Sequence, residues 1–194
     1  MYKNILIIGA ARTGKTTLAR KIQKEFGYNL VSLDDIICAL EEYPECHIKH
    51  DGDENETAKN FSPFLKRYMI ELSEGTNFYN GVKSVIEGTH IDFEELMPFL
   101  KDEKVRDKYI VIGLTYNSID EQTLYNEIKK NDTEDDWTYW CDDEELKGNV
   151  KYFIERNKYF NKKFKEYDII TFDTSINRKQ VLADAVQSLK ELGK

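Results

Sequence analysis

The fold is decided by the stretch Gly9-Ala10-Ala11-Arg12-Thr13-Gly14-Lys15-Thr16. It matches the pattern G-x-x-x-x-G-K-[ST], a phosphate-binding loop in which backbone N–H groups surround the phosphates of a nucleotide. The apolar run from Asn4 to Ile8 precedes it and predicts a buried strand, and residues 16–22 continue at helical spacing. The strand, loop and helix that this motif requires are therefore expected. The alternative, a glycine-containing turn that binds nothing, is disfavoured because every fixed position is met.

Each position of this loop has a physical reason. The two glycines allow backbone conformations that a side chain would forbid, and the first turn of the following helix adds unpaired N–H groups and a positive dipole end. Lys15 is expected to reach the β- and γ-phosphates, and the Thr16 hydroxyl to ligate Mg²⁺. We therefore expect ATP and Mg²⁺ as ligands, bound by Gly9, Ala11, Arg12, Thr13, Gly14, Lys15, Thr16 and Thr17.

Length and charge narrow the class of protein. With 194 residues the chain is most simply one domain, residues 1–194, and its net charge of -8 argues against broad binding of nucleic acid. No apolar run approaches the length of a membrane span, and no signal-like segment precedes the first strand. We expect a cytoplasmic protein that does not enter a membrane.

The cysteines and their neighbours do not form a recognisable metal site. Cys38, Cys46 and Cys141 are odd in number and are not closely paired. Cys46, His47 and His50 could supply three metal ligands, but no second ligand pair follows at a suitable distance. We interpret this cluster as surface residues.

Apolar runs alternate with helical patterns along the whole chain. Strands are expected at residues 4–8, 29–33, 83–86, 108–114 and 168–172, with helices at about 16–25, 36–40, 62–78, 93–100, 119–130, 146–164 and 181–192. This alternation predicts an α/β fold, a parallel sheet covered by helices on both faces. Residues 41–60 are expected to be a loop, and the acidic segment, residues 132–145, carries Trp137, Tyr139 and Trp140.

Polar residues follow the expected strands at the edge where ligands bind to such sheets. Asp34 could accept the proton of a phosphate acceptor or hold it in line, although Asp34 or Asp35 could instead cap the next helix. We expect Tyr116 and the run Asp173, Thr174 and Ser175 to reach the same crevice.

The end of the third strand supplies further candidates. Glu87 could hold a Mg²⁺-bound water or bind the substrate, and Gly88 would allow a ligand close to the backbone. His90 could contact the acceptor, although a lone histidine is more often structural. Asp35 and Arg67 are also candidates for the substrate side.

Transfer of a phosphoryl group also needs mobile cations. Arg156 is the preferred candidate because a guanidinium makes two parallel hydrogen bonds to a phosphate. Arg12 is another option, and Lys129 and Lys130 are more simply a solvated helix face.

With these pieces placed, the chain resembles the small P-loop kinases of the adenylate kinase-like group, which includes shikimate, gluconate and nucleoside kinases. The motifs that carry the resemblance are Gly9 to Thr16, Leu33-Asp34-Asp35, Ile86-Glu87-Gly88-Thr89 and the ending Tyr167 to Ser175. The resemblance implies a three-layer P-loop NTPase fold with sheet order 2-3-1-4-5. It also implies a substrate-side insertion at about 41–80 and a lid-like segment at about 130–165, before the last strand.

The same resemblance implies roles for particular residues. The acid that meets the acceptor would be Asp34, the lid cations would lie between Lys129 and Arg156, and Asp173 to Ser175 would touch the adenine. The chain departs from the pattern in two places. It has Glu87-Gly88-Thr89-His90 where such kinases often have Asp-Gly and then an arginine, and its lid has Arg156 and lysines around an acidic centre.

The leading interpretation is an ATP-dependent phosphotransferase that moves the γ-phosphate to a small-molecule acceptor, with a nucleoside or nucleotide as the best candidate. One alternative is a nucleotide-dependent ATPase or switch that acts through a protein partner docked on the acidic segment. Another is a kinase of RNA or DNA ends, which the net charge disfavours. The acceptor, the preference between ATP and GTP, and the oligomeric state stay open.

Overall fold

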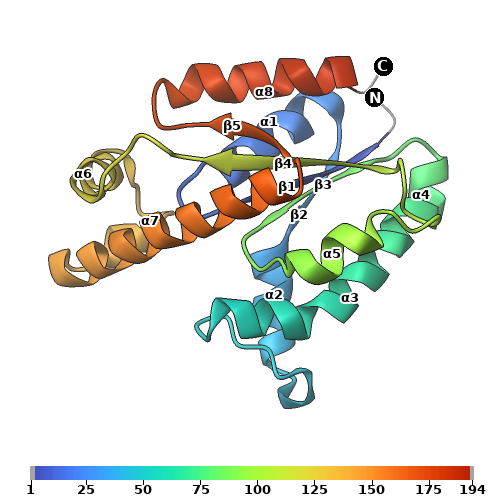
Figure 1. Ribbon diagram of the computed structural model, residues 1–194, viewed down its shortest axis with the longest axis horizontal. Coiled ribbons are helices and arrows are strands. Elements are labelled where there is room, and N and C mark those ends of the chain that lie inside the picture. Colours follow the sequence, from blue (N-terminus) through green and yellow to red (C-terminus); the bar gives the residue numbers. More distant parts are fainter. Residues whose placement is uncertain (1–2, 193–194) are drawn as a thin grey trace.

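The sheet is parallel throughout, with the strand order β2-β3-β1-β4-β5 (Figure 1). The structure is a computed structural model that describes residues 3–192; residues 1, 2, 193 and 194 lie outside the described part. The strands are β1 (Asn4–Gly9), β2 (Asn29–Ser32), β3 (Ser84–Gly88), β4 (Tyr109–Thr115) and β5 (Ile170–Asp173). The predicted α/β class and strand order are confirmed.

Helices cover both faces of the sheet because successive side chains of a strand point to opposite faces. One face packs against α1 (Lys15–Phe26) and α8 (Arg178–Leu192), with Ile5, Ile7 and Ile112 in the shared core. The other face, where Leu6, Ile8 and Ile86 point, packs against α2 (Leu33–Glu41), α3 (Glu54–Glu74), α5 (Phe93–Phe99) and α7 (Asp143–Glu166). The three-layer arrangement predicted from the sequence is present (Figure 1).

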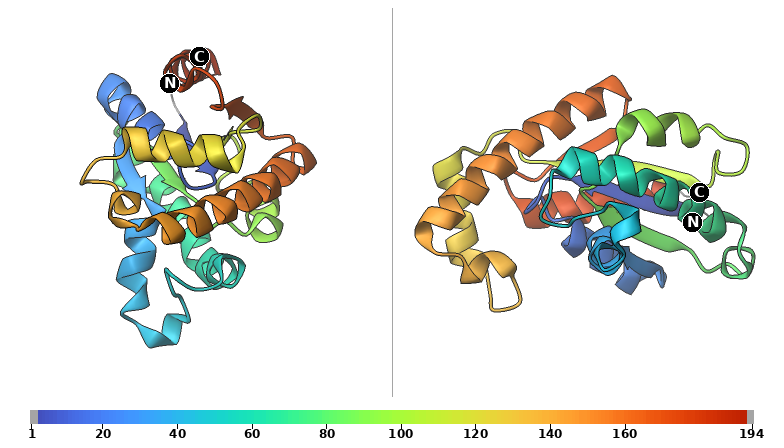
Figure 2. Two further views of the ribbon diagram at one scale, coloured as in Figure 1. Left: turned by 90° about the vertical axis from the view of Figure 1, so that its left-hand side faces the viewer. Right: turned by 90° about the horizontal axis from the view of Figure 1, so that it is seen from below.

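The carboxyl ends of the strands meet at one edge of the sheet. Register places Ile7 beside Glu87, Ser32 beside the same Glu87, and Thr115 beside Asp173. Beyond this edge lie α6 (Glu121–Asn131), the short helix η2 (Trp137–Trp140) and the first turns of α7, as Figure 2 shows from that side. The first part of the segment predicted as lid-like, at about 130–165, therefore lies at the carboxyl edge, whereas its last part, in α7, packs on the sheet.

Asp34 and Asp35 do not cap α2, as the sequence pattern had allowed. The strand β2 ends one residue earlier than expected, and the Ser32 hydroxyl accepts the N–H of Asp35 as the N-cap. Both aspartates therefore lie inside the first turn of α2, where the positive end of the helix dipole stabilises a negative charge. Asp34 is left free of a capping role.

The insertion at 41–80 is more ordered than the sequence indicated. Helix α3 begins at Glu54, not near Ser62, because Asp53 caps it by accepting the N–H of Glu56. Thr57 and Ala58 are buried under an otherwise polar first turn, which hid the helical pattern. The segment between α2 and α3 contains only the short helix η1 (Pro44–Cys46), and α4 (Thr76–Tyr79) follows α3.

The two edge strands are less buried than the central ones. β1 and β3 are buried along their full length, whereas β2 and β5 are mostly half-buried or exposed. No helix within residues 3–192 is both long enough and apolar enough to cross a membrane.

Candidate functional site: a phosphate-binding loop facing two carboxylates

The phosphate-binding loop joins β1 to α1 in a conformation that needs both glycines. Gly14 has a φ of 99°, a region that L side chains rarely adopt. A Cβ at Gly9 would lie 2.5 Å from the carbonyl oxygen of Leu114. Gly14 also stands at the N-cap of α1 without a side-chain cap, so the first N–H groups of the helix are available to an anion.

The side chain of Lys15 crosses this loop and brings its ammonium to the backbone of Ala10. Its Nζ donates to the carbonyl oxygen of Ala10 at 3.0 Å, and its side chain is buried. Burial lowers the pKa of Lys15, while the carboxylates of Glu87, Asp34 and Glu54 act in the opposite direction. A buried cation among acids is well placed to meet the charge of a phosphate.

Residues more than a hundred positions later in the chain form hydrogen bonds to the outside of the loop. The hydroxyl of Tyr116 donates to the carbonyl of Ala11 at 3.1 Å, and a guanidinium nitrogen of Arg178 donates to the carbonyl of Arg12. The Thr174 hydroxyl lies 3.0 Å from the carbonyl oxygen of Thr13 and 2.9 Å from that of Thr115. Thr115 also accepts the backbone N–H of Thr174 at 2.7 Å, so Thr174 joins the loop at Thr13 to the end of β4 at Thr115.

Thr16 and Glu87 meet across the loop. The Thr16 hydroxyl donates to Glu87 Oε1 at 2.9 Å, and Glu87 is 4% exposed. Burial raises the pKa of Glu87, and the charge of Lys15 and the Thr16 hydroxyl act against that rise. Adjacent hydroxyl and carboxylate oxygens are the donors that Mg²⁺ prefers, so this pair fits the metal that accompanies a nucleotide.

Asp34 contacts His90 at the carboxyl edge of the sheet. The two atoms Asp34 Oδ1 and His90 Nδ1 are 3.4 Å apart, too poorly aligned for a hydrogen bond, and no other described group donates to this buried oxygen. Burial alone would raise the pKa of Asp34, but the contacts with His90 and the charge of Lys15 lower it below its usual value. Asp34 is therefore an ionised carboxylate with a free lone pair.

Gly88 is required by packing against α2. A Cβ at this position would lie 2.7 Å from Cβ of Leu33, so the strand and the helix that carry Glu87 and Asp34 touch closely. His90 is buried and its ring lies 6.0 Å from that of His50, which reaches the site from the segment between α2 and α3.

A cavity of about 200 Å³ lies beside the loop, on the side away from Asp34. Arg12 and Arg178 border it. The rest of its wall comes from the segment between β4 and α6, from the inner face of α6 and from the residues after β5: Tyr116, Ile119, Thr123, Leu124, Glu127, Ile128, Asn131, Thr174, Ser175 and Asn177. Asp173 shapes that wall, because its Oδ1 accepts the N–H groups of Asn117 at 3.1 Å and Ser175 at 3.0 Å. The size and mixed polarity suit one heterocyclic base.

Arg12 joins the phosphate-binding loop to the acidic segment. Its guanidinium pairs with Asp132 and, at 2.8 Å, with Asp136. The residue has a φ of 66°, and the side chain of Asp132 is 2% exposed. The acidic segment is thus tied to the loop at the carboxyl edge of the sheet.

The remaining predicted residues are not all gathered at the loop. Arg156 pairs with Glu54, and Arg67 is exposed and pairs with Glu71 within α3. Asp35 is exposed on α2, and Lys129 pairs with Asp143 at 2.8 Å. Thr17 is exposed in the first turn of α1, Thr13 is buried, and the hydroxyl of Thr13 donates to Ala10.

Sequence reasoning missed Glu54, Arg178 and Asn157. Glu54 lies in a stretch that read as a loop, and Arg178 lies at the start of a helix known only by its apolar residues. Asn157 is buried and its side chain bonds the backbone N–H and C=O of Tyr116 at 3.1 and 3.3 Å. A polar residue on the apolar stripe of the helix predicted at 146–164 was the available signal for Asn157.

Solved structures of small kinases share this architecture. A gluconokinase from Sinorhizobium meliloti matches with a TM-score of 0.61 and 13% identity, over 98% of this chain and 93% of that chain. A shikimate kinase from Acinetobacter baumannii, in complex with shikimate, matches with a TM-score of 0.56 and 16% identity, over 99% of this chain and 93% of that chain.

A second shikimate kinase, from Bacteroides thetaiotaomicron, has a TM-score of 0.56 and 17% identity, over 98% of this chain and 97% of that chain. At these identities the likeness shows a shared fold, that of the small P-loop kinases. No protein-family model and no curated protein sequence matches the chain.

Proposed function

We propose that the protein is an ATP-dependent phosphotransferase that moves the γ-phosphate to a hydroxyl of a small molecule. The observation that carries the proposal is the pairing of a complete phosphate-binding loop, with Lys15 buried in it, and an ionised Asp34 whose Oδ1 receives no hydrogen bond within the described chain. A carboxylate facing the phosphates supports this reading, because an acceptor hydroxyl needs a group that takes its proton.

The transfer step follows from these positions. The acceptor oxygen forms a bond to the γ-phosphorus as the bond from that phosphorus to the β,γ-bridging oxygen breaks, and ADP leaves. The hydroxyl proton passes to the Asp34 carboxylate and, because that side chain is 44% exposed, from there to water. Lys15 exchanges the Ala10 carbonyl for phosphate oxygens, which are stronger acceptors for its N–H groups.

Thr16 and Glu87 would hold Mg²⁺, directly or through water, together with the phosphates. The metal would supply charge neutralisation for the β- and γ-phosphate oxygens. Removing it with EDTA should therefore stop transfer, and adding Mg²⁺ back should restore it.

The nucleotide base would occupy the cavity between Arg12 and Arg178, next to Asp173, Thr174 and Ser175. Residues at about 130–165 would act as a lid, since they lie beyond the phosphate-binding loop and contact it through Arg12. The acceptor would enter from the side of Asp34 and His90, with residues at about 41–80 forming its wall. A nucleoside or a nucleotide is the best candidate for that acceptor.

A screen of small-molecule acceptors with γ-labelled ATP tests the proposal. Label should move from ATP to at least one hydroxyl compound, and the Lys15→Ala protein should move none. Steady release of inorganic phosphate with no labelled acceptor would contradict the proposal.

That last outcome would favour a second candidate, a nucleotide-dependent switch that binds a protein partner. The observation behind it is the exposure of Trp137, Tyr139 and Trp140 in the acidic segment. A switch must bind its partner differently with and without ATP, and a pull-down in both states would measure that difference.

A further inference from the structure

The guanidinium of Arg156 is already neutralised by a carboxylate from another element. Its Nη2 lies 2.8 Å from Glu54 Oε1, and its Nη1 donates to Asn55 Oδ1 at 3.0 Å. The side chains of Arg156 and Glu54 are only 12% and 11% exposed, so the pair is largely removed from water. The positive charge of Arg156, which the sequence analysis assigned to the lid, therefore pairs with a carboxylate at the start of α3.

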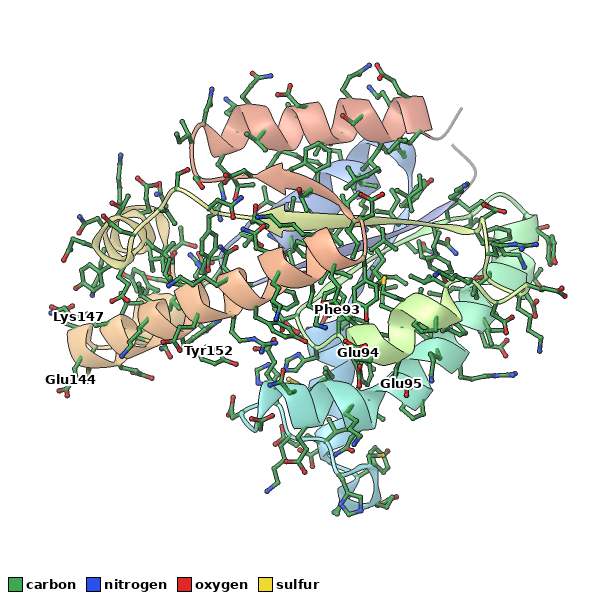
Figure 3. All side chains as sticks on the ribbon, viewed as in Figure 1. Phe93, Glu94, Glu95, Glu144, Lys147 and Tyr152 are labelled. Carbon is green, nitrogen blue, oxygen red and sulfur yellow. The ribbon has the colours of Figure 1, made fainter. Side chains whose placement is uncertain are left out.

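Glu54 is held by a second donor as well. The hydroxyl of Tyr152, one turn before Arg156 on α7, donates to Glu54 Oε2 at 2.6 Å (Figure 3 labels Tyr152). Two donors on one carboxylate fix its position. Glu54 and Arg156 are thus a compensated pair that joins α3 to α7.

The Glu54–Arg156 pair lies beside the segments that carry the two histidines of the site. Arg156 packs over the rings of Tyr159 and Phe160, and both rings contact Phe93, three residues past His90. Glu54 begins α3 four residues after His50. His90 and His50 lie on the Asp34 side of the same region. An acceptor that approaches Asp34 would therefore meet a carboxylate and imidazoles, and the guanidinium of Arg156 in the neighbouring pair is compensated.

We infer that the acceptor is an uncharged or amine-bearing alcohol, not a carboxylate- or phosphate-bearing one, and that Glu54 determines this specificity. The inference rests on the proposed phosphotransferase activity and, between nucleoside and nucleotide, favours the nucleoside. An anionic acceptor would face the carboxylates of Asp34 and Glu87 with no uncompensated guanidinium from this pair. To gain Arg156 it would have to leave Glu54 buried without its partner, which is costly. An ammonium beside the reacting hydroxyl of the acceptor would instead be attracted by the same carboxylates.

Matched acceptors test the charge preference directly. The full-length protein with Mg²⁺ and ATP is assayed with D-gluconate, D-glucitol and 1-amino-1-deoxy-D-glucitol, and with adenosine against adenosine monophosphate. In whichever series accepts phosphate, the uncharged or amine compound should have a kcat/KM at least about tenfold above that of the anionic one. A higher kcat/KM for the acid or the monophosphate would overturn the inference.

The role of Glu54 is tested with Glu54→Gln and the matched control Glu56→Gln. Glu56 lies two residues further along the same turn of α3, is exposed, and its carboxylate has no hydrogen bond or ion pair within residues 3–192. Glu54→Gln frees Arg156 from its counter-charge, so the ratio of uncharged to anionic kcat/KM should fall about tenfold. Glu56→Gln should leave that ratio as in the parent protein.

A ratio measured on one preparation does not depend on the fraction of folded enzyme, so loss of protein through misfolding does not imitate the effect. An unchanged ratio in Glu54→Gln would overturn the assignment to Glu54. If neither series, nor the wider acceptor screen, takes any phosphate while ATP hydrolysis persists, the phosphotransferase proposal itself fails. Transfer with the opposite charge preference refutes only the acceptor class.

Discussion

The phosphate-binding loop and the acidic segment lie next to each other at the carboxyl edge of the sheet, yet they are held in different ways. The loop is tied by Tyr116, Thr174 and Arg178, which come from three separate elements. The acidic segment is held largely by its own short-range bonds, such as Thr133 to Asp136 and Trp140 to the carbonyl of Glu134. Arg12 is where the two regions meet.

This difference in how the two regions are held predicts a difference in their mobility. A loop fixed from several sides keeps its shape without a ligand, so nucleotide binding does not have to supply the free energy of ordering it. A segment fixed largely by short-range bonds can move relative to the loop once its tie to the loop, Arg12, is released. We therefore expect chemistry to depend most on the loop and its facing acids, and motion to depend most on the acidic segment.

The largest expected effect comes from removing the cation in the loop. Lys15→Ala should reduce ATP-dependent transfer by at least about a thousandfold, because the other cation of the loop, Arg12, is paired with Asp132 and Asp136 and is not free to replace it. A labelled-ATP assay measures it, with Lys24→Ala on the exposed side of α1 as the control. Activity within tenfold of the parent protein would remove Lys15 from the mechanism.

Asp34→Asn should spare nucleotide binding and lower the transfer rate by about 10²–10⁴-fold, the usual contribution of a positioned base. Calorimetry with ATP and the transfer assay together separate binding from chemistry. Glu42→Gln, just past the end of α2, is the control. If Asp34→Asn is fully active, Glu87 becomes the candidate base.

Two glycines extend the comparison to stability. A Cβ on Gly113 in β4 would lie 2.5 Å from Cε2 of the buried Phe164, so Gly113→Ala should destabilise the protein by about 1–3 kcal/mol. Gly148, in the first turns of α7, has nothing within 4 Å of that position, so Gly148→Ala should stabilise by about 0.5–1 kcal/mol. Urea unfolding measures both changes in the free energy of unfolding. Shifts of the same sign would mean that packing does not distinguish the central strand β4 from the first turns of α7.

The smallest expected effect concerns motion. Arg12→Ala removes the partner of Asp132 and Asp136, so amide hydrogen exchange over residues 132–140 should rise roughly tenfold while residues 4–9 of β1 stay unchanged. Arg20→Ala, exposed on α1, is the control. Unchanged exchange over 132–140 would show that the segment holds itself in place.

The sequence was sufficient for the parts of this architecture that depend on local patterns. The loop motif and the buried strands were predicted from the residues, because fixed spacing and apolar periodicity are properties of neighbouring residues. The sheet order was implied by the resemblance to small P-loop kinases and is confirmed. Helix α3 was predicted to begin too late, because its polar first turn shows its buried side only in the folded chain. The roles of Asp34, Glu87 and Arg156 stay predictions.

What the sequence could not show were contacts between residues far apart in the chain. Nothing in the pattern around Glu54 indicates that Arg156 and Tyr152, about a hundred residues away, would bind its carboxylate. Likewise, the pairing of Arg12 with Asp132 and Asp136 depends on how α6 and η2 are placed beyond the sheet. Such pairs follow from tertiary packing, which periodicity does not describe.

The bond from Thr174 to the carbonyl of Thr13 has a consequence for biosynthesis. The ribosome makes the nucleotide motif first and the residue that braces it 161 positions later. A nascent chain that ends before β5 carries the motif without its support, and contacts of such long sequence separation form late. We expect a growing polypeptide to capture ATP only after its last strand has joined the sheet.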